Sequence, residues 1–355
     1  MRERIEPITY RVHLALIFLA TSVLFGCSER GEIDFAKPDA SATTHKIWVS
    51  NFRSTAPATA RSAPPRPENL SFEAIGISVP PTHTPGQIEW PDGTPDARTD
   101  FVSVSQEKFD TMREFTNDIV NSDQAGRGET LVYVHGYNTR HAEAVYQVAQ
   151  FVHDLDVPVP PVLFSWPSAG VTAGYVYDRD SALLSRDELE AVLVSLTRDG
   201  RKVVLVGHSL GSYLIMETLR QIELKNSLNI ARDIDAVVLM APDIDGELFR
   251  DQATALNALP DPFIIMVAKQ DRALKISSLL TGRRPRLGAQ SDRTIVGDLP
   301  ITIVDLSDLA EGAEFNHKIA TTSPAAVSIL RELSKEVPPG QVRLGPFVIL
   351  SQLAL

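Results

Sequence analysis

The sequence contains a single cysteine, Cys27, among 355 residues. One cysteine cannot form a disulfide within the chain, so a fold held together by disulfide bonds is excluded. The sequence also lacks His, Cys and carboxylate residues clustered at metal-binding spacings, and its one cysteine lies near the N-terminus. We therefore expect a protein that works without a metal ion or another cofactor.

Positive charge is scarce as well. The 34 Lys and Arg residues face 45 Asp and Glu residues, which leaves a formal net charge of −11. An acidic surface repels the phosphates of nucleic acids, so we expect no nucleic-acid partner. The hydrophobic share of 43% and the charged share of 22% are those of a globular chain with room for one large α/β domain or two small ones.

Long apolar runs are absent too. The one marked run, residues 14–26 (LALIFLATSVLFG), follows an N-terminal stretch with three arginines. Its length suits the hydrophobic part of a signal peptide better than a membrane-spanning helix. The run ends in Leu24-Phe25-Gly26-Cys27, which resembles the lipobox of bacterial lipoproteins, where the cysteine is lipidated and becomes the new N-terminus.

The lipobox resemblance implies a signal peptide over residues 1–26 and an acyl (palmitate-type) anchor on Cys27. Ser28, rather than aspartate, follows the cysteine. By resemblance to the sorting of Gram-negative lipoproteins, this favours the periplasmic face of the outer membrane. An uncleaved signal anchor and an ordinary secretory signal remain alternatives for the same segment.

The domain organisation follows from a change of pattern along the chain. Residues 27–69 are expected to hold the lipid-attachment site, a tether, a short strand at 46–49 and a Pro-rich loop at 54–69. The α/β domain is assigned to residues 70–337, and residues 338–355 form a C-terminal tail. Residues 28–99 could add edge strands to the sheet of that domain.

Strands and helices alternate from residue 100 onward, which predicts a mostly parallel, doubly wound α/β sheet with helices on both faces. The aliphatic strands lack period-2 alternation, as expected when both faces of a sheet are buried. The predicted strands are residues 70–79, 130–134, 162–165, 202–206, 234–240, 263–267 and 301–304, and the predicted helices are residues 141–155, 181–197, 209–222 and 323–333.

One pentapeptide, Gly207-His208-Ser209-Leu210-Gly211, stands between the strand VVLV and a predicted helix. In such a tight strand-to-helix turn the serine hydroxyl is pushed outward, near a helix N-terminus that favours negative charge. The flanking glycines remove side chains that would collide with neighbouring elements. The placement therefore predicts Ser209 as a nucleophile.

The partners of a nucleophilic serine on this fold follow it in the order acid, then histidine. Of eight histidines only His317 comes after Ser209, so His317 is predicted as the general base. Asp271, which follows the strand at 263–267, is the favoured acid. Asp243, one strand earlier, is the alternative acid.

The oxyanion of an acyl-transfer intermediate needs two preorganised N–H donors. The residue after the nucleophile, Leu210, is predicted to supply one of them. The second is expected from the loop after the strand LVYV, where Tyr137 is favoured and Gly136 is the fallback. The alternative is that His135-Gly136 only forms a turn.

Several blocks, among them VYVHGYN, VLFSWPSAG, GHSLGSYLIMETLR, VVLMAPDID and KQDRAL, resemble an uncharacterised bacterial branch of the α/β-hydrolases with esterase- and lipase-like members. The resemblance implies the α/β-hydrolase fold, Ser209 as nucleophile and an esterase-like activity, although this branch has no agreed substrate. We expect an acyl-ester small molecule or a lipid-like substrate. Trp166 and His208 are candidate pocket residues, and Trp166 is equally compatible with a scaffold role. The neighbours Asp178 and Arg179 carry the same ambiguity.

A basic segment between the predicted acid and base contains six cations, and it could be a rim or lid that recognises an anionic group, or simply a solvated loop. The six are Arg272, Lys275, Arg283, Arg284, Arg286 and Arg293. Two functions thus remain: a lipid-anchored serine hydrolase with a Ser-His-Asp triad and an acyl-enzyme intermediate, or a non-catalytic envelope lipoprotein that uses a hydrolase scaffold for binding.

Overall fold

A computed structural model describes residues 32–53, 65–123 and 126–307. They belong to one compact unit that begins at Ile33. The signal peptide, Cys27, His317 and the helix expected at 323–333 lie outside the described residues. What the sequence indicates for them stays a prediction.

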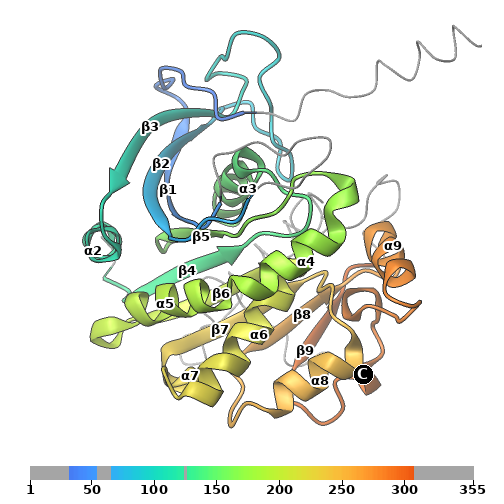
Figure 1. The fold of residues 1–355 in the computed structure, drawn as a ribbon. Helices are drawn as coiled ribbons and strands as arrows, with labels where there is room; N and C mark the ends of the chain where they lie inside the picture. Colours follow the sequence, from blue (N-terminus) through green and yellow to red (C-terminus); the bar gives the residue numbers. More distant parts are fainter. Residues whose placement is uncertain (1–31, 54–64, 124–125, 308–355) are drawn as a thin grey trace, which may run out of the picture. The chain divides into compact units, whose positions relative to one another are not determined.

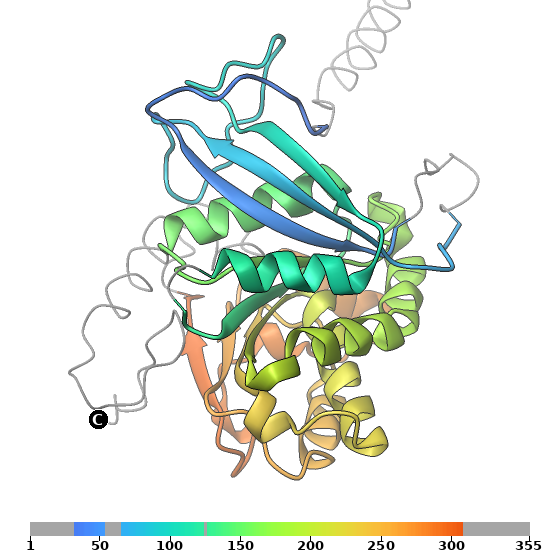
Figure 2. The same ribbon diagram turned by 90° about the vertical axis from the view of Figure 1, so that its left-hand side faces the viewer.

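The strands of the described residues form one nine-stranded sheet in the order β3-β2-β1-β5-β4-β6-β7-β8-β9 (Figure 1). β1, β5, β4, β6, β7, β8 and β9 run parallel, and β2 is antiparallel to both of its neighbours. Figure 2 shows how strongly the sheet twists between β1–β3 and β8–β9. The strands are β1 (Thr43–Asn51), β2 (Ser71–Val79), β3 (Val102–Phe109), β4 (Glu129–Val134), β5 (Pro161–Ser165), β6 (Lys202–His208), β7 (Ile234–Met240), β8 (Phe263–Val267) and β9 (Thr302–Asp305).

Helices cover both faces of this sheet, which separates two hydrophobic cores. Val132 and Val134 of β4 point into one core, with α2, α4, α5, α6 and α8, while Leu131 and Tyr133 point into the other, with α3. The helices are α2 (Met112–Ser122), α3 (His141–Asp154), α4 (Tyr175–Leu184), α5 (Arg186–Leu196), α6 (Leu210–Lys225), α7 (Ile230–Asp233), α8 (Gly246–Thr254) and α9 (Arg272–Leu280), and the short 3-10 turns are η1 (Thr172–Gly174), η2 (Arg198–Gly200), η3 (Leu287–Ala289) and η4 (Arg293–Ile295).

The predicted mostly parallel sheet with two covered faces is confirmed, but the predicted domain start at residue 70 is too late. β1 lies inside the sheet between β2 and β5 rather than before the domain. Its Ile47 and Val49 side chains are completely buried. The sheet therefore needs residues 43–51, and the compact unit begins ahead of them.

Other differences concern helices. The single helix expected at 181–197 is two helices, α4 and α5, which meet at Ser185. The Ser185 hydroxyl donates a hydrogen bond to the carbonyl of Ser181 (2.7 Å), a local bond that favours a helix end over continuation. The strand β3 and the helices α2, α7, α8 and α9 have no counterpart in the prediction. None of the described helices is long and apolar enough to cross a bilayer.

The parallel strands end at a common edge of the sheet, which we call the carboxyl edge, and begin at the opposite, amino edge. Ser209 follows β6, Tyr137 follows β4, Asp243 follows β7 and Asp271 follows β8. All of these predicted site residues therefore lie at the carboxyl edge. This is the edge at which ligands bind in open α/β sheets.

Candidate active site

Ser209 forms a sharp turn between β6 and α6, with φ 54° and ψ −119°. A positive φ is costly for a serine, so the surrounding structure must hold it. The Ser209 N–H donates to the carbonyl of Met240 at the end of β7 (2.9 Å). The Ser209 carbonyl accepts from the N–H groups of Ser212 (3.0 Å) and Asp243 (3.3 Å), which ties the turn to α6 and to the loop after β7.

The two glycines around Ser209 are required by space. A Cβ on Gly211 would lie 2.2 Å from the carbonyl oxygen of Val134 and 2.5 Å from that of His135. A Cβ on Gly207 would lie 2.9 Å from the backbone of Ser212. Because these contacts are with backbone atoms, a side chain at Gly211 or Gly207 would displace the turn, β4 or α6.

The loop after β4 comes directly to Ser209, the predicted nucleophile. A Cβ on Gly136 would lie 2.7 Å from the ring nitrogen Nδ1 of His208 and 3.0 Å from the Cβ of Ser209. The backbone of Gly136 therefore faces Ser209, with Tyr137 next in the chain. Leu210 is the first residue of α6, where an N–H has no acceptor inside the helix. The two predicted sources of oxyanion donors thus approach the serine from different elements.

Buried Asp178 of α4 fixes the position of this loop. Its carboxylate accepts hydrogen bonds from the N–H of Asn138 (2.9 Å), the N–H of Ala169 (2.6 Å) and the hydroxyl of Ser168 (2.7 Å). Burial raises the pKa of Asp178, although the three donors favour its charged form. Asp178 therefore acts on the loop backbone, while Arg179 lies over the ring of Tyr213 (5.8 Å).

His135 and Trp166 form the support beneath the same loop. Their rings stack with centroids 4.7 Å apart, and the Trp166 indole N–H donates to the His135 carbonyl (2.7 Å). Burial, and then the charge of Arg53, lower the pKa of His135 to about 3, so its ring is neutral. Trp166 is completely buried. Among the described residues, Trp166 therefore packs beneath the loop. His208, the other candidate pocket residue, lies against Gly136.

Arg53, two residues after β1, also binds the loop that follows β4. Its guanidinium donates to the carbonyls of Thr139 (2.9 Å) and Ser168 (3.0 Å). It therefore joins the end of β1 to the loops after β4 and β5. Nothing in the sequence around Arg53 signals this role, because its two acceptors are backbone atoms about 86 and 115 positions away.

The two candidate acids have different surroundings. Asp271 is completely buried and begins α9, where its carboxylate accepts from the N–H of Leu274 (3.0 Å). Asp243 is buried in a side-chain network instead. One of its oxygens accepts from Ser277 (2.5 Å) and pairs with Arg286 (3.1 Å), and the other accepts from the hydroxyl of Tyr175 (3.0 Å).

The Asp243–Arg286 pair is an internal ion pair, since both side chains are about 5% exposed or less. Burial, and then the negative charge of Asp243, raise the pKa of Tyr175 to about 12. Tyr175 therefore stays protonated and donates. Both Asp243 oxygens are thus occupied by groups from α4, α9 and the segment before η3, and the network joins those elements beside the turn at Ser209.

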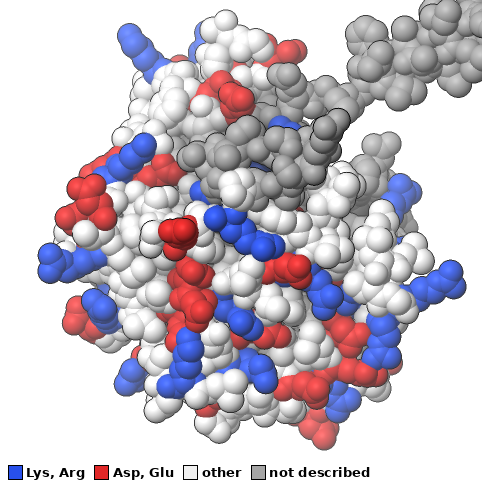
Figure 3. Space-filling model, viewed as in Figure 1, with Lys and Arg blue, Asp and Glu red and all other residues white. Residues whose placement is uncertain are grey.

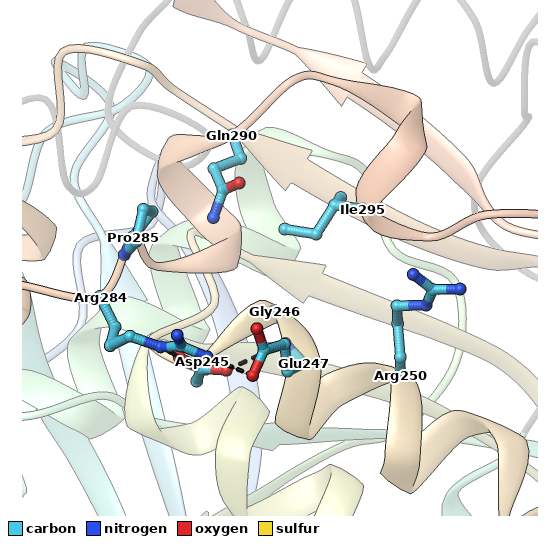
Figure 4. Close-up of a pocket in the computed structure, with 8 residues that line it drawn as sticks. All are labelled: Asp245, Gly246, Glu247, Arg250, Arg284, Pro285, Gln290 and Ile295. Atoms are coloured by element: carbon cyan, nitrogen blue, oxygen red, sulfur yellow. Dashed lines mark hydrogen bonds and ion pairs between the residues drawn. The ribbon is translucent and has the colours of Figure 1, made fainter.

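Arg284, two residues before Arg286, lies in a shallow pocket of about 230 Å³ at the start of α8. Figure 4 shows its guanidinium meeting Asp245 and Glu247, with Arg250 on the opposite side of the pocket. The Arg284–Asp245 distance is 3.0 Å. None of the residues that line this pocket is a predicted catalytic residue. Within the described ranges, no group of three or more His, Cys, Asp and Glu side chains is arranged to hold a metal ion.

Solved structures similar to this chain include esterase PE8 (18% identity, 58% of this chain and 92% of that chain, TM-score 0.36), a predicted CIB-like hydrolase from Thermoplasma acidophilum (13%, 74% and 93%, 0.35) and an inhibited esterase B from Lactobacillus rhamnosis (12%, 94% and 100%, 0.34). A search of curated proteins finds no significant match. The model of one protein family, described as α/β hydrolase of unknown function (DUF900), matches residues 108–333.

Proposed function

The chain belongs to this family of α/β-hydrolases, DUF900, and from that premise we propose that it is a serine hydrolase that cleaves an ester or a related acyl bond. The observation that carries the proposal is the turn at Ser209. A buried strand, a serine with φ 54° and a helix follow one another there, between glycines that leave no room for a side chain. Such strain is retained in proteins mainly where function requires it.

In the proposed reaction the Ser209 Oγ attacks the acyl carbonyl carbon while His317 takes the hydroxyl proton. The N–H groups of Leu210 and Tyr137, with Gly136 as the alternative to Tyr137, donate to the oxyanion that forms. The tetrahedral intermediate then collapses, and the leaving alcohol receives the proton from His317. Water attacks the acyl-enzyme in the same way, which releases the acid and restores Ser209.

We assign the acid of the triad to Asp271. Its carboxylate lies at the end of the strand before the one that precedes His317, and it is buried, as an acid that orients an imidazole must be. Asp243 is bound on both oxygens by Tyr175, Ser277 and Arg286, so it has less freedom to hold a histidine. This favours a structural role for Asp243.

A fluorophosphonate probe tests the proposal on the full chain, because it reacts only with an activated serine. We expect stoichiometric labelling, loss of labelling in Ser209→Ala, and retention in Ser212→Ala. Ser212 is a matched control: it is buried three residues further on, and its hydroxyl donates only to the Gly207 carbonyl (2.8 Å). Absence of labelling in the unaltered, folded protein would favour the binding-protein alternative.

We also propose that the protein is a lipoprotein anchored through Cys27 in a bacterial envelope, at the periplasmic face of the outer membrane. A multiply acylated cysteine anchors firmly, whereas a single chain is marginal. Cys27→Ser should abolish lipidation and leave an uncleaved or mislocalised precursor. Intact-mass measurement and membrane fractionation test this, and a mature N-terminus elsewhere than Cys27 would contradict it.

A further inference from the structure

The helix α9 has an exposed face that is apolar in the middle and basic at its side. Ile276, Leu279 and Leu280 are 59%, 63% and 61% exposed. Arg272 and Lys275 are exposed as well. These five positions follow the spacing i, i+3, i+4, i+7 and i+8, so they share one face of the helix. Leucine and isoleucine side chains that are this exposed and this close together are uncommon on a protein surface.

The opposite face of α9 is fixed to the candidate active site. Asp271 caps its N-terminus, and Ser277 bonds to Asp243 and to the Tyr175 hydroxyl (2.8 Å). The position of α9 is therefore determined by the residues beside the nucleophile turn. Its apolar face points outward next to the active site, and Val176 of α4, which follows Tyr175, is also 71% exposed.

The charges near this face are uncompensated. Within the described residues, Arg272, Lys275 and the exposed Arg283 have no ion-pair partner, whereas Arg284 pairs with Asp245 and Glu247. Figure 3 shows an uncharged area over α9 with Lys and Arg side chains at its border. A positive border around an apolar surface is unexpected in a chain of net charge −11, and it complements a negatively charged lipid surface.

We propose that α9 docks the protein on an anionic lipid bilayer, with Ile276, Leu279 and Leu280 in the acyl region and Arg272, Lys275 and Arg283 at the headgroups. This rests on the proposed hydrolase function and narrows it: the substrate is an acyl ester held in an anionic membrane. Because Asp271 caps the N-terminus of α9, docking brings the candidate active site to the lipid surface from which the ester is drawn.

A fluorescent label on α9 tests docking separately from the N-terminal segment, because the dye reports only on its own surroundings. In the full chain with Cys27→Ser, the substitution Leu279→Cys provides a single attachment point for an environment-sensitive dye. Vesicles of phosphatidylglycerol and phosphatidylcholine should shift its emission to the blue, and pure phosphatidylcholine vesicles should shift it much less. Leu224→Cys is the matched control, since Leu224 is 71% exposed near the end of α6, and its label should not respond.

Charge variants test the electrostatic part. Lys275→Gln should weaken partitioning onto the anionic vesicles about fivefold, which corresponds to about 1 kcal/mol for one cation near such a surface. Arg220→Gln, an exposed arginine on α6, is the matched control and should leave partitioning unchanged. Added salt should reduce the difference between the two variants, because it screens exposed charges.

Hydrolysis measurements separate this inference from the proposed function. Ile276→Ser with Leu279→Ser should lower turnover of an ester presented in anionic vesicles at least tenfold and leave hydrolysis of a soluble short-chain ester within twofold. No hydrolysis of either ester by the unaltered protein overturns the proposed function. If the Ile276→Ser, Leu279→Ser variant hydrolyses both esters as fast as the unaltered protein, and the dye at position 279 does not respond to vesicles, docking alone is overturned. If the Ile276→Ser, Leu279→Ser variant changes its oligomeric state but hydrolyses the ester in vesicles at the unaltered rate, docking is also overturned. The exposed face of α9 would then be assigned to contact with a second copy of the chain.

Discussion

Residues with a positive φ occur at both edges of the sheet, but the residue types differ in part between the edges. At the amino edge the residues with positive φ are Asp156, Asp199 and Asn226, short polar residues that tolerate this conformation. At the carboxyl edge Asn138, Ser209 and Ala241 adopt it, at φ 54°, 54° and 44°, and serine and alanine do not do so readily. The turns at the amino edge therefore follow local preference, whereas the turns at Ser209 and Ala241 are imposed by their surroundings.

The surroundings that impose this conformation are tight packing and backbone hydrogen bonds. The Ala241 N–H donates to Met266 of β8 (2.9 Å), and a Cβ on Gly288 would lie 2.5 Å from the carbonyl carbon of Ala241. Buried charges are present at both edges, but their partners differ. Asp178 and Asp243 bind groups of the loops at the carboxyl edge, where the candidate active site lies, while Asp154 at the amino edge binds His83. In the part of the chain that the structure describes, strained turns, close packing and buried charge thus lie together at the carboxyl edge, where the chemistry is proposed.

The largest effect is expected from the triad itself. Ser209→Ala and His317→Ala should each lower kcat by about 10⁴-fold or more, and the double variant should lose no more than either single one, because the two residues act as a unit. Steady-state kinetics on the best ester substrate measures this. Losses that multiply in the double variant would contradict a shared step.

Replacing the acids should separate catalysis from structure. Asp271→Asn should cost about 10⁴-fold in kcat, since the amide fails to stabilise the imidazolium cation, while asparagine still caps α9. Asp243→Asn should cost much less activity and more stability, because it leaves Arg286 buried without a counter-charge. The reverse ranking in folded proteins would move the acid to Asp243.

Removing Arg286 from its internal ion pair with Asp243 should destabilise the fold at the carboxyl edge. Arg286→Met should lower the free energy of unfolding by about 3–5 kcal/mol, because Asp243 loses its buried partner. Arg284→Met is the control, since its pairs are at the surface and contribute about 1 kcal/mol or less. Urea denaturation checks both, and equal losses in the two variants would show that burial of the pair is unimportant.

Glycine substitutions at positions with positive φ compare the backbone strain at the two edges directly. Ser209→Gly should stabilise the protein by about 1 kcal/mol, since glycine avoids the cost of a serine at φ 54° and ψ −119° but adds entropy to the unfolded chain. Asn226→Gly at the end of α6 should change stability by less than about 0.5 kcal/mol, because asparagine already suits the conformation. Denaturation midpoints give the comparison, which fails if both glycines have the same effect.

The smallest effect is expected at the amino edge, as a pH dependence. Burial opposes the charge of His83, but its bonds to Asp154 (3.0 Å) and Glu89 (2.8 Å) prevail and raise its pKa. A raised pKa stabilises the fold fully below the unfolded value, near pH 6.5, and the contribution disappears as pH rises through the folded pKa. The stability lost in His83→Gln should therefore be larger at pH 6 than at pH 9.

The ring of His45 meets His153, and His153 in turn meets His83. The pKa shift of His45 has the opposite sign to that of His83. Burial, and then the charge of His153, lower the pKa of His45 to about 4. The unfolded chain binds a proton at His45 near pH 6 that the folded chain does not, so wild-type stability contributed by this group falls as pH drops below about 6.5. Parallel pH profiles for His45→Gln and His83→Gln would contradict this assignment.

Local chemistry made much of the fold and of the proposed site predictable. The aliphatic strands without alternation indicated a sheet covered on both faces, and the two cores confirm it. The pentapeptide around Ser209 indicated a tight turn, because glycine is needed wherever a backbone passes within 3 Å of another. These features depend on a few consecutive residues, which is why the sequence alone carries them.

Contacts between distant residues were decided by the tertiary structure. The short strand predicted at 46–49 was assigned to the segment before the α/β domain, because four residues do not indicate which strands they will pair with, yet β1 lies inside the sheet. Asp243 forms an internal ion pair with Arg286, far along the chain, and nothing in the sequence around Asp243 indicated that partner. A pairing of this kind depends on how loops cross at the carboxyl edge, and no local preference encodes that crossing.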